Sequence, residues 1–287
     1  MVFRYQVVKR REGQSVETVL KEEFMISAYL LKKIRLYGSI TCNGREIKIY
    51  DLVAAGDLLA ATWDFEGKEA GWITCETIPI LYQDTCFLIV DKPSNLCVHP
   101  SRGHSQDSLI TRLSGGNFLN VVTRLDRDTS GLVLLAKNGY WHNRFATTQI
   151  SKIYYGLVRG KPIVPQGVIE EPIEREHEGS IKRIVCADGK RAVTSYRLIK
   201  YNEEIDCSIL EFQLFTGRCH QIRVHSAHIG HPLIGDGLYG NGDRDRELEG
   251  QRLLCGKLVF VHPGTGEKIE IELPDIRQRL ISNEIEM

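Results

Sequence analysis

The chain has 287 residues, of which 42% are hydrophobic and 26% charged, and it contains 26 Gly and 9 Pro. This is the composition of an ordinary folded protein, and it excludes the disordered, collagen-like and low-complexity classes. One hydrophobic core of this size is close to the practical limit, so the length favours two domains. The 37 basic and 37 acidic residues cancel, so a surface that binds a polyanion must be local.

The longest apolar runs, such as residues 87–90, are far shorter than the roughly 20 residues of a membrane span. The first residues carry no signal-peptide pattern. The eight cysteines are scattered without a C-x-x-C pair, which favours neither disulfides nor a zinc ribbon. We therefore expect a cytoplasmic protein with reduced thiols and no membrane contact.

Two short helices are predicted near the N-terminus, because apolar residues recur at helical spacing in 16–21 and in 28–35. Gly38 ends the second helix, and the Asn43-Gly44 pair is a strong signal for a two-residue hairpin turn. A strand pair follows and closes at residues 56–57. The first fifty residues carry ten Lys and Arg against five Glu, so the N-terminal end is the basic one.

This order of elements over about residues 15–62 resembles the alpha-L motif, a small RNA-binding module first named from a small-subunit ribosomal protein. In that family the basic face of the helices contacts RNA phosphates. The resemblance implies phosphate contacts for Lys32, Lys33, Arg35 and Arg45. The alternative is an ordinary solvated helix face.

A mixed, polar stretch follows the module. We predict a module at 1–62, a linker at 63–77 and a larger domain at 78–287. Strands of the larger domain are predicted at 79–82, 86–90, 132–136, 153–158, 193–199, 207–215 and 257–272, and helices at 105–113, 140–149 and 219–229. Because the strands outnumber the helices and come mostly in hairpins, the pattern predicts an α+β domain with a mixed, largely antiparallel sheet flanked by helices.

A short charged segment is the most informative feature of the larger domain. Residues 124–137 read RLDRDTSGLVLLAK, so two carboxylates and two guanidinium groups precede an apolar strand. This places a charged site at the rim of a core. From composition alone a capped surface turn is the stronger alternative, because Asp, Thr, Ser and Gly are also turn formers.

The same segment resembles the signature motif of the RluA-type pseudouridine synthases, which modify uridines in ribosomal or transfer RNA. Further segments of the chain match the family's motifs in the family's order. They are IVDKP at 89–93 with VHP at 98–100, KIY at 152–154, TGRCHQIRVH at 216–225, GHPLIGD at 230–236 and FVHP at 260–263. Together they cover roughly residues 78–274, and their joint occurrence is highly specific.

The resemblance implies a redox-neutral isomerisation that needs no cofactor. The C–N glycosidic bond of uridine is broken, the captive uracil rotates, and a C–C bond forms to the same sugar. Asp126 occupies the family's catalytic position, where a carboxylate either adds covalently or takes a proton. Both routes remain open from the sequence. Arg223 matches the residue that pairs with this carboxylate, and Tyr154 matches the tyrosine that lies against the uracil.

The target nucleotide must leave its helical stack before it can react, at a cost of a few kcal/mol. Arg124 matches the family's residue that enters the vacated space. Arg127 and Arg218 are candidate phosphate contacts, with simple surface charge as the equal alternative. We expect an RNA partner, most readily large-subunit ribosomal RNA because of the alpha-L resemblance, with transfer RNA as the alternative, and a monomer.

Four positions depart from the family pattern. Thr123 stands where His usually precedes R-L-D, Cys219 stands where Thr or Ser is usual, and Cys255-Gly256 stands where His-Ala is common. None is the expected catalytic group, so the departures concern substrate choice or fine geometry.

Two other classes of protein compete with an RNA-modifying enzyme. His220, His225, His228 and His231 lie close in sequence and could bind a metal, but they include no H-E-x-x-H and no acidic ligand. We therefore expect no metal. A non-catalytic RNA-binding protein would have lost Asp126, Tyr154 or Arg223, and all three are present.

Overall fold

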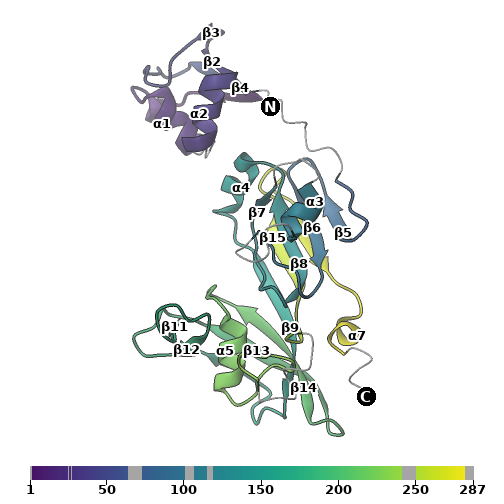
Figure 1. Cartoon of the computed structure of the whole chain (residues 1–287). Helices are drawn as coiled ribbons and strands as arrows, with labels where there is room; N and C mark the ends of the chain where they lie inside the picture. The colour runs from purple at the N-terminus through teal and green to yellow at the C-terminus, as the bar shows by residue number, and fades with distance from the viewer. Residues whose placement is uncertain are drawn as a thin grey trace.

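The computed structural model describes residues 2–24, 26, 28–63, 73–100, 107–114, 119–240 and 250–281. The N-terminal elements form a small group of their own, in purple in Figure 1. A four-stranded sheet with the order β1-β4-β2-β3 packs with two helices and a 3-10 turn. These elements are β1 (Val2–Gln6), η1 (Lys9–Arg11), α1 (Val16–Glu23), α2 (Ala28–Tyr37), β2 (Gly38–Cys42), β3 (Arg45–Glu46) and β4 (Leu58–Trp63).

Local sequence signals account for most of this module. The Ser15 hydroxyl accepts a hydrogen bond from the Thr18 N–H at 3.2 Å and caps α1. Asn43 and Gly44 have φ of 51° and 80°, the left-handed pair that a type I′ hairpin turn requires. Both predicted helices begin where the sequence places them. The sequence did not predict β1. This strand pairs with β4, so the first and last strands of the module lie side by side.

An aromatic contact joins the module to the larger domain. The rings of Phe3 and Tyr140 lie 4.8 Å apart, and Phe3 also contacts Phe24 at 4.6 Å. Tyr140 is therefore part of the module's hydrophobic core, although it lies in α4 (Gly139–Phe145). The division at 1–62, 63–77 and 78–287 stays a prediction, and residues 64–72 of the predicted linker lie outside the described residues.

The larger domain contains a ten-stranded sheet with the main order β10-β13-β14-β9-β15-β8-β6-β5, while β16 pairs with β15 and β7 with β8. Its strands are β5 (Ile80–Gln83), β6 (Phe87–Lys92), β7 (Asn120–Val121), β8 (Ser130–Ala136), β9 (Ser151–Arg159), β10 (Gln166–Ile169), β13 (Thr194–Asn202), β14 (Cys207–Leu214), β15 (Leu253–Val261) and β16 (Lys268–Glu272). All neighbours are antiparallel except β8 and β15, which are parallel. The predicted α+β class with a mixed, largely antiparallel sheet is confirmed.

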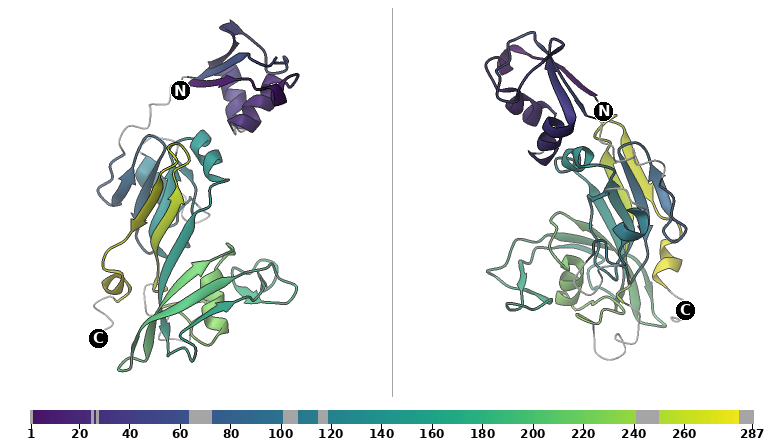
Figure 2. Two further views of the ribbon diagram at one scale, coloured as in Figure 1. Left: turned by 180° about the vertical axis from the view of Figure 1, so that it is seen from behind. Right: turned by 45° about the horizontal axis from the view of Figure 1, so that its top comes forward.

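Helices and a small hairpin flank this sheet (Figure 2). They are α3 (Leu109–Ser114), α4, α5 (Gln221–His228), α7 (Ile276–Leu280) and the separate pair β11 (Ile173–Arg175) and β12 (Arg183–Val185). The sequence did not predict β10, β11, β12 or α7, because they are short and carry little apolar periodicity. The first two residues of the predicted helix at 105–113 lie outside the described residues. No helix within the described ranges is long and apolar enough to span a membrane.

The parallel contact between β8 and β15 decides the geometry beside the charged loop. Gly131 has a φ of +103°, and a Cβ there would lie 2.3 Å from the Cys255 carbonyl oxygen. Only glycine allows so close an approach of two backbones. The glycine of the RLDRDTSG segment therefore holds the start of β8 against β15.

Candidate active site

Asp126 lies in the loop between β7 and β8, at the rim of the sheet. Its backbone carbonyl accepts a hydrogen bond from the Thr129 N–H at 3.2 Å, and Thr129 is held in turn by the Gln251 amide at 3.0 Å. The Asp126 side chain is 33% exposed. The loop is thus fixed from within while its carboxylate remains accessible to a substrate.

A buried lysine anchors the same loop to the preceding motif. Lys92 is fully buried, and its ammonium donates to the carbonyls of Pro93, Leu96 and Arg127 at 2.8 Å each. Burial lowers the pKa of Lys92 to about 8, against the opposing charges of nearby carboxylates such as Asp128. The three carbonyls satisfy all three N–H groups of the ammonium. Lys92 therefore joins the IVDKP segment to the RLDRD segment.

Arg223 approaches Asp126 from α5. Its Nη1 lies 3.4 Å from Asp126 Oδ2. Two shorter bonds, at 2.7 Å and 2.8 Å, run from its Nε and Nη2 to the carboxylate of Asp236, which is completely buried. The two-point contact of the guanidinium is therefore with Asp236, and the remaining edge of the group faces Asp126.

Tyr154 lies on β9, beside the same loop, and its side chain is almost fully buried. Burial, with the neighbouring Cys255 and Asp126, raises the pKa of Tyr154 well above its usual value. The phenol is therefore protonated at neutral pH. Burial also raises the pKa of Cys255 to about 12, so a neutral thiol packs beside this phenol in place of the family's more common histidine.

The structure thus brings Asp126, Arg223 and Tyr154 together from three separate elements. It also adds Asp236, Lys92 and His220, whose Nε2 lies 3.9 Å from Asp126 Oδ2. All three additions fall in segments that match the family motifs. Their position within those motifs was the signal that could have identified these three residues from the sequence. Which residues each of them contacts depends on the fold.

The predicted RNA-binding residues of the larger domain lie around this group. Arg124 is exposed and has no hydrogen-bond or ion-pair partner among the described residues. Arg127 is already paired with Asp128 at 2.8 Å. Arg218 is exposed and donates from Nε to the Arg191 carbonyl at 2.9 Å. Arg124 is consequently the arginine beside Asp126 that is free to reach a substrate.

The predicted contacts of the N-terminal module lie on separate elements from this site. Lys32 and Arg35 are exposed on α2, and Arg45 is exposed on β3. Lys33 also belongs to α2, but its side chain lies outside what the structure describes. These three exposed cations lie on elements of the module and not on the elements that carry Asp126, Tyr154 and Arg223.

Two departures from the family pattern have a visible environment. Thr123 is buried, and its hydroxyl accepts a hydrogen bond from the Leu134 N–H at 2.9 Å. Cys219 is exposed and directly precedes His220, so it can vary without disturbing the core.

Three of the clustered histidines bond to separate partners. His220 bonds to the Tyr239 hydroxyl, His225 to Thr194 and the Glu171 carbonyl, and His231 to the Arg159 carbonyl. Both ring nitrogens of His225 are engaged in this way, as is Nδ1 of His220 and of His231.

A different group within the described ranges, Asp84, Cys86 and His262, has the spacing of metal ligands. His262 Nδ1 accepts hydrogen bonds from the N–H groups of Gly264 and Thr265, and Nε2 bonds to Asp84 at 2.9 Å. Burial raises the pKa of Cys86 to about 11, so its thiol stays protonated. These bonds give the group a structural role that connects β5, β6 and the end of β15.

Comparison with known proteins assigns the chain to a family. The profile of the RNA pseudouridylate synthase family matches residues 86–228. The uncharacterised RNA pseudouridine synthase YlyB of Bacillus subtilis is 36% identical over 264 residues, which cover 86% of each chain. The ribosomal large subunit pseudouridine synthase D of Pseudomonas aeruginosa is 32% identical over 83% of this chain and 80% of its own.

A solved structure agrees in fold. Human RNA Pseudouridylate Synthase Domain Containing 1 superposes with a TM-score of 0.59 at 25% identity, over 70% of this chain and 85% of that one. The carboxylate at the rim of the sheet, with its arginine and buried tyrosine, lies within the matched region. The chain belongs to the RNA pseudouridine synthase family, of the RluA type, and is an isomerase that converts uridine in RNA to pseudouridine.

Proposed function

We propose that the substrate is large-subunit ribosomal RNA and that Asp126 is the catalytic carboxylate. Two relatives support the choice of RNA by their names, the large-subunit synthases D of Pseudomonas aeruginosa and of Zymomonas mobilis, the second 34% identical over 71% of each chain. The observation that carries the assignment of Asp126 is its contact with Arg223 at 3.4 Å in an accessible loop.

The groups around Asp126 suit the steps of the isomerisation. Its carboxylate attacks the sugar or the base, or removes a proton, while the Arg223 guanidinium stabilises the negative charge. The protonated Tyr154 phenol offers a flat, apolar face for the uracil with one donor at its edge. Because the uracil must rotate without escaping, a buried wall on one side and an accessible loop on the other are both required.

Binding of the RNA is divided between two surfaces in this proposal. Arg124 enters the stack at the place of the extruded nucleotide and offsets part of the unstacking cost, a few kcal/mol. The basic residues of the module, Lys32, Lys33, Arg35 and Arg45, contact phosphates away from the reacting base. Affinity and chemistry then depend on different residues.

The test is to map pseudouridine in cellular RNA with and without the gene, and after complementation with the wild-type enzyme or with Asp126→Asn. Loss of specific sites from large-subunit ribosomal RNA, restored by the wild type alone, is the expected result. Sites lost from transfer RNA would replace the proposed substrate. Single-turnover rates of Asp126→Asn near the wild-type value would refute the role of Asp126.

The remaining expectations are a monomer and a cytoplasmic location. The proposed active site is built from one chain, because Asp126, Tyr154, Arg223 and Asp236 all come from it. Sedimentation of the RNA-free protein and of its complex tests the first expectation, and fractionation of cells tests the second.

A further inference from the structure

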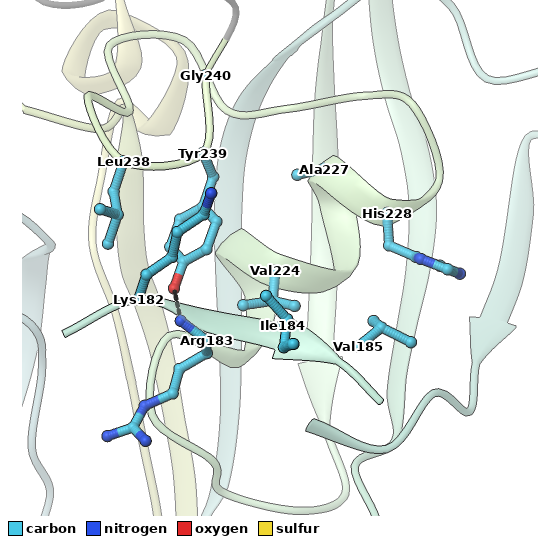
Figure 3. A pocket seen from close by; sticks show the side chains of 10 residues that line it. All are labelled: Lys182, Arg183, Ile184, Val185, Val224, Ala227, His228, Leu238, Tyr239 and Gly240. Carbon is cyan, nitrogen blue, oxygen red and sulfur yellow. Dashed lines mark hydrogen bonds between the residues drawn. The ribbon is translucent and has the colours of Figure 1, made fainter. Parts of the chain in front are cut away.

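A chain of polar contacts leads from β12 to Asp126 through Tyr239 and His220. The Tyr239 hydroxyl accepts a hydrogen bond from the Arg183 backbone N–H at 2.8 Å, as Figure 3 shows. The same hydroxyl lies 2.9 Å from His220 Nδ1. The tautomer of His220 follows from its other ring nitrogen. Nε2 faces the carboxylate of Asp126, which can only accept, so Nδ1 is assigned as the acceptor of a hydrogen bond from the Tyr239 hydroxyl.

This assignment places the ring hydrogen of a neutral His220 on Nε2. Nε2 lies 3.9 Å from Asp126 Oδ2, and Arg223 Nη1 lies 3.4 Å from the same oxygen. Both donors therefore approach one oxygen of the carboxylate. The other oxygen, Oδ1, has no hydrogen-bond partner among the described residues, so it is the oxygen left for the substrate.

The backbone of His220 shows that its position is held against a local cost. Its φ is +58° and its ψ is 21°, in the left-handed region, at the residue that precedes α5. A non-glycine residue in that region is strained, because its Cβ crowds the backbone. No side-chain cap bond at the helix start compensates for this cost. The conformation turns the imidazole toward Tyr239, whose ring lies 5.7 Å away and edge-on.

We propose that His220 is a positioning residue that holds Oδ2 of Asp126 through its Nε2–H, with Tyr239 fixing the tautomer that makes this possible. The inference rests on Asp126 being the catalytic carboxylate. If Oδ2 is held in this way, the Asp126 carboxylate cannot rotate freely, and Oδ1 already points toward the uridine site before the RNA binds. At 3.9 Å the Nε2–H bond is long in the free enzyme, and catalytic hydrogen bonds of this kind tighten in the substrate complex.

Burial of the ring favours the neutral form that the proposal requires. Burial lowers the pKa of His220, and the cations Arg223 and Arg183 act in the same direction, while Asp126 and Asp236 oppose them. The groups that face the ring come from the Asp126 loop, from α5, from the segment after α5 and from β12. Protonation would put a second hydrogen on Nδ1, facing the hydroxyl hydrogen of Tyr239. The proposal therefore predicts that the chemical step slows as the pH falls and His220 becomes charged.

The test compares His220→Leu with His220→Gln in single-turnover reactions at saturating RNA. A glutamine amide nitrogen can occupy the place of Nε2 and donate, whereas leucine cannot. We expect His220→Leu to lower the rate by about 100-fold, as for a misplaced catalytic group, with unchanged affinity for RNA. His220→Gln should recover most of that rate, and its rate should no longer fall at acid pH.

Tyr239→Phe provides a second and milder variant, because it removes only the hydroxyl. It should slow the chemical step and move the acid limb of its pH profile, since Nδ1 loses its donor. Equal rates for His220→Leu and the wild type, or equally slow His220→Gln and His220→Leu in proteins with wild-type melting, would overturn the proposal. Asp126→Asn, measured alongside, separates the two assignments, because an active Asp126→Asn refutes the catalytic carboxylate itself.

Discussion

The guanidinium of Arg223 is held by Asp236, through bonds of 2.7 Å and 2.8 Å, and reaches Asp126 only with its remaining edge. Asp236 also accepts hydrogen bonds from the N–H groups of Leu238 and Tyr239. The arginine is thus fixed by a carboxylate that is itself fixed by the backbone. This arrangement orients a positive charge at the Asp126 loop without depending on the substrate.

Asp236→Asn is expected to damage both stability and catalysis. The variant leaves a buried guanidinium with a neutral partner, and breaking a buried pair costs about 3 kcal/mol or more of unfolding free energy. The Arg223 group would lose its orientation, so the single-turnover rate should fall by about 100-fold. Denaturant unfolding and single-turnover kinetics measure the two effects.

Arg223→Lys tests the same pair from the other side. One ammonium cannot make the two parallel bonds to Asp236 and also face Asp126. We expect a loss of rate comparable with that of Asp236→Asn. Arg197→Lys is the matched control, because Arg197 forms an exposed pair with Glu211. A normal rate for Arg223→Lys would show that a point charge at this position is sufficient.

Lys92→Met is expected to affect stability more than chemistry. Methionine fills a similar volume but cannot donate to the carbonyls of Pro93, Leu96 and Arg127. The Arg127 carbonyl still accepts from the Leu96 N–H at 3.1 Å, whereas the buried Leu96 carbonyl loses its donor, at a cost of about 1 kcal/mol or more. Lys92 contacts no reacting group, so turnover well below the melting temperature should remain measurable. Thermal melts and rates at low temperature distinguish the effects. Loss of turnover in a fully stable variant would instead assign Lys92 to the chemistry.

Asp84→Asn is expected to reduce the sensitivity of the fold to acid. Burial opposes ionisation of Asp84, but hydrogen bonds from the N–H groups of Phe87 and Cys86 and from His262 outweigh it, so its pKa is lowered. A carboxylate whose pKa is lowered in the folded state stabilises the fold at pH values above its unfolded-state pKa of 3.8. This stabilisation is lost as the pH falls through the lower folded-state pKa. Urea unfolding from pH 6 to pH 2 should show a shallower decline in the variant. An identical decline would mean that Asp84 does not contribute to acid unfolding.

The module's basic surface is expected to control the salt dependence of RNA binding. Replacing Lys32, Arg35 and Arg45 together by Gln removes three candidate phosphate contacts. The slope of log affinity against log salt should fall by about 2 to 3, with the single-turnover rate unchanged at saturating RNA. The matched control replaces three exposed lysines of the larger domain, Lys161, Lys200 and Lys268. Equal slopes for both triple variants would remove the module as a principal contact.

The sequence by itself determined the elements that depend on neighbouring residues. The helices at 16–21 and 28–35, the Asn43-Gly44 turn and the apolar run of 132–136 each depend on residues close together in the sequence, so their structures follow from local chemistry. Short motifs also placed Asp126 at the entrance to a buried strand. The strands β10, β11 and β12 escaped prediction because runs of three or four residues are too short to show a periodic pattern.

The tertiary structure alone decided which charged groups meet. Arg223 and Asp126 are 97 positions apart, and Lys92 and Arg127 are 35 apart. Nothing in the local pattern distinguishes Asp236 from Asp126 as the partner that holds Arg223 at two points. That choice depends on burial, because a completely enclosed carboxylate must be paired, while one at the rim can remain accessible to the substrate. Which carboxylate is enclosed is fixed only when the sheet and α5 pack together.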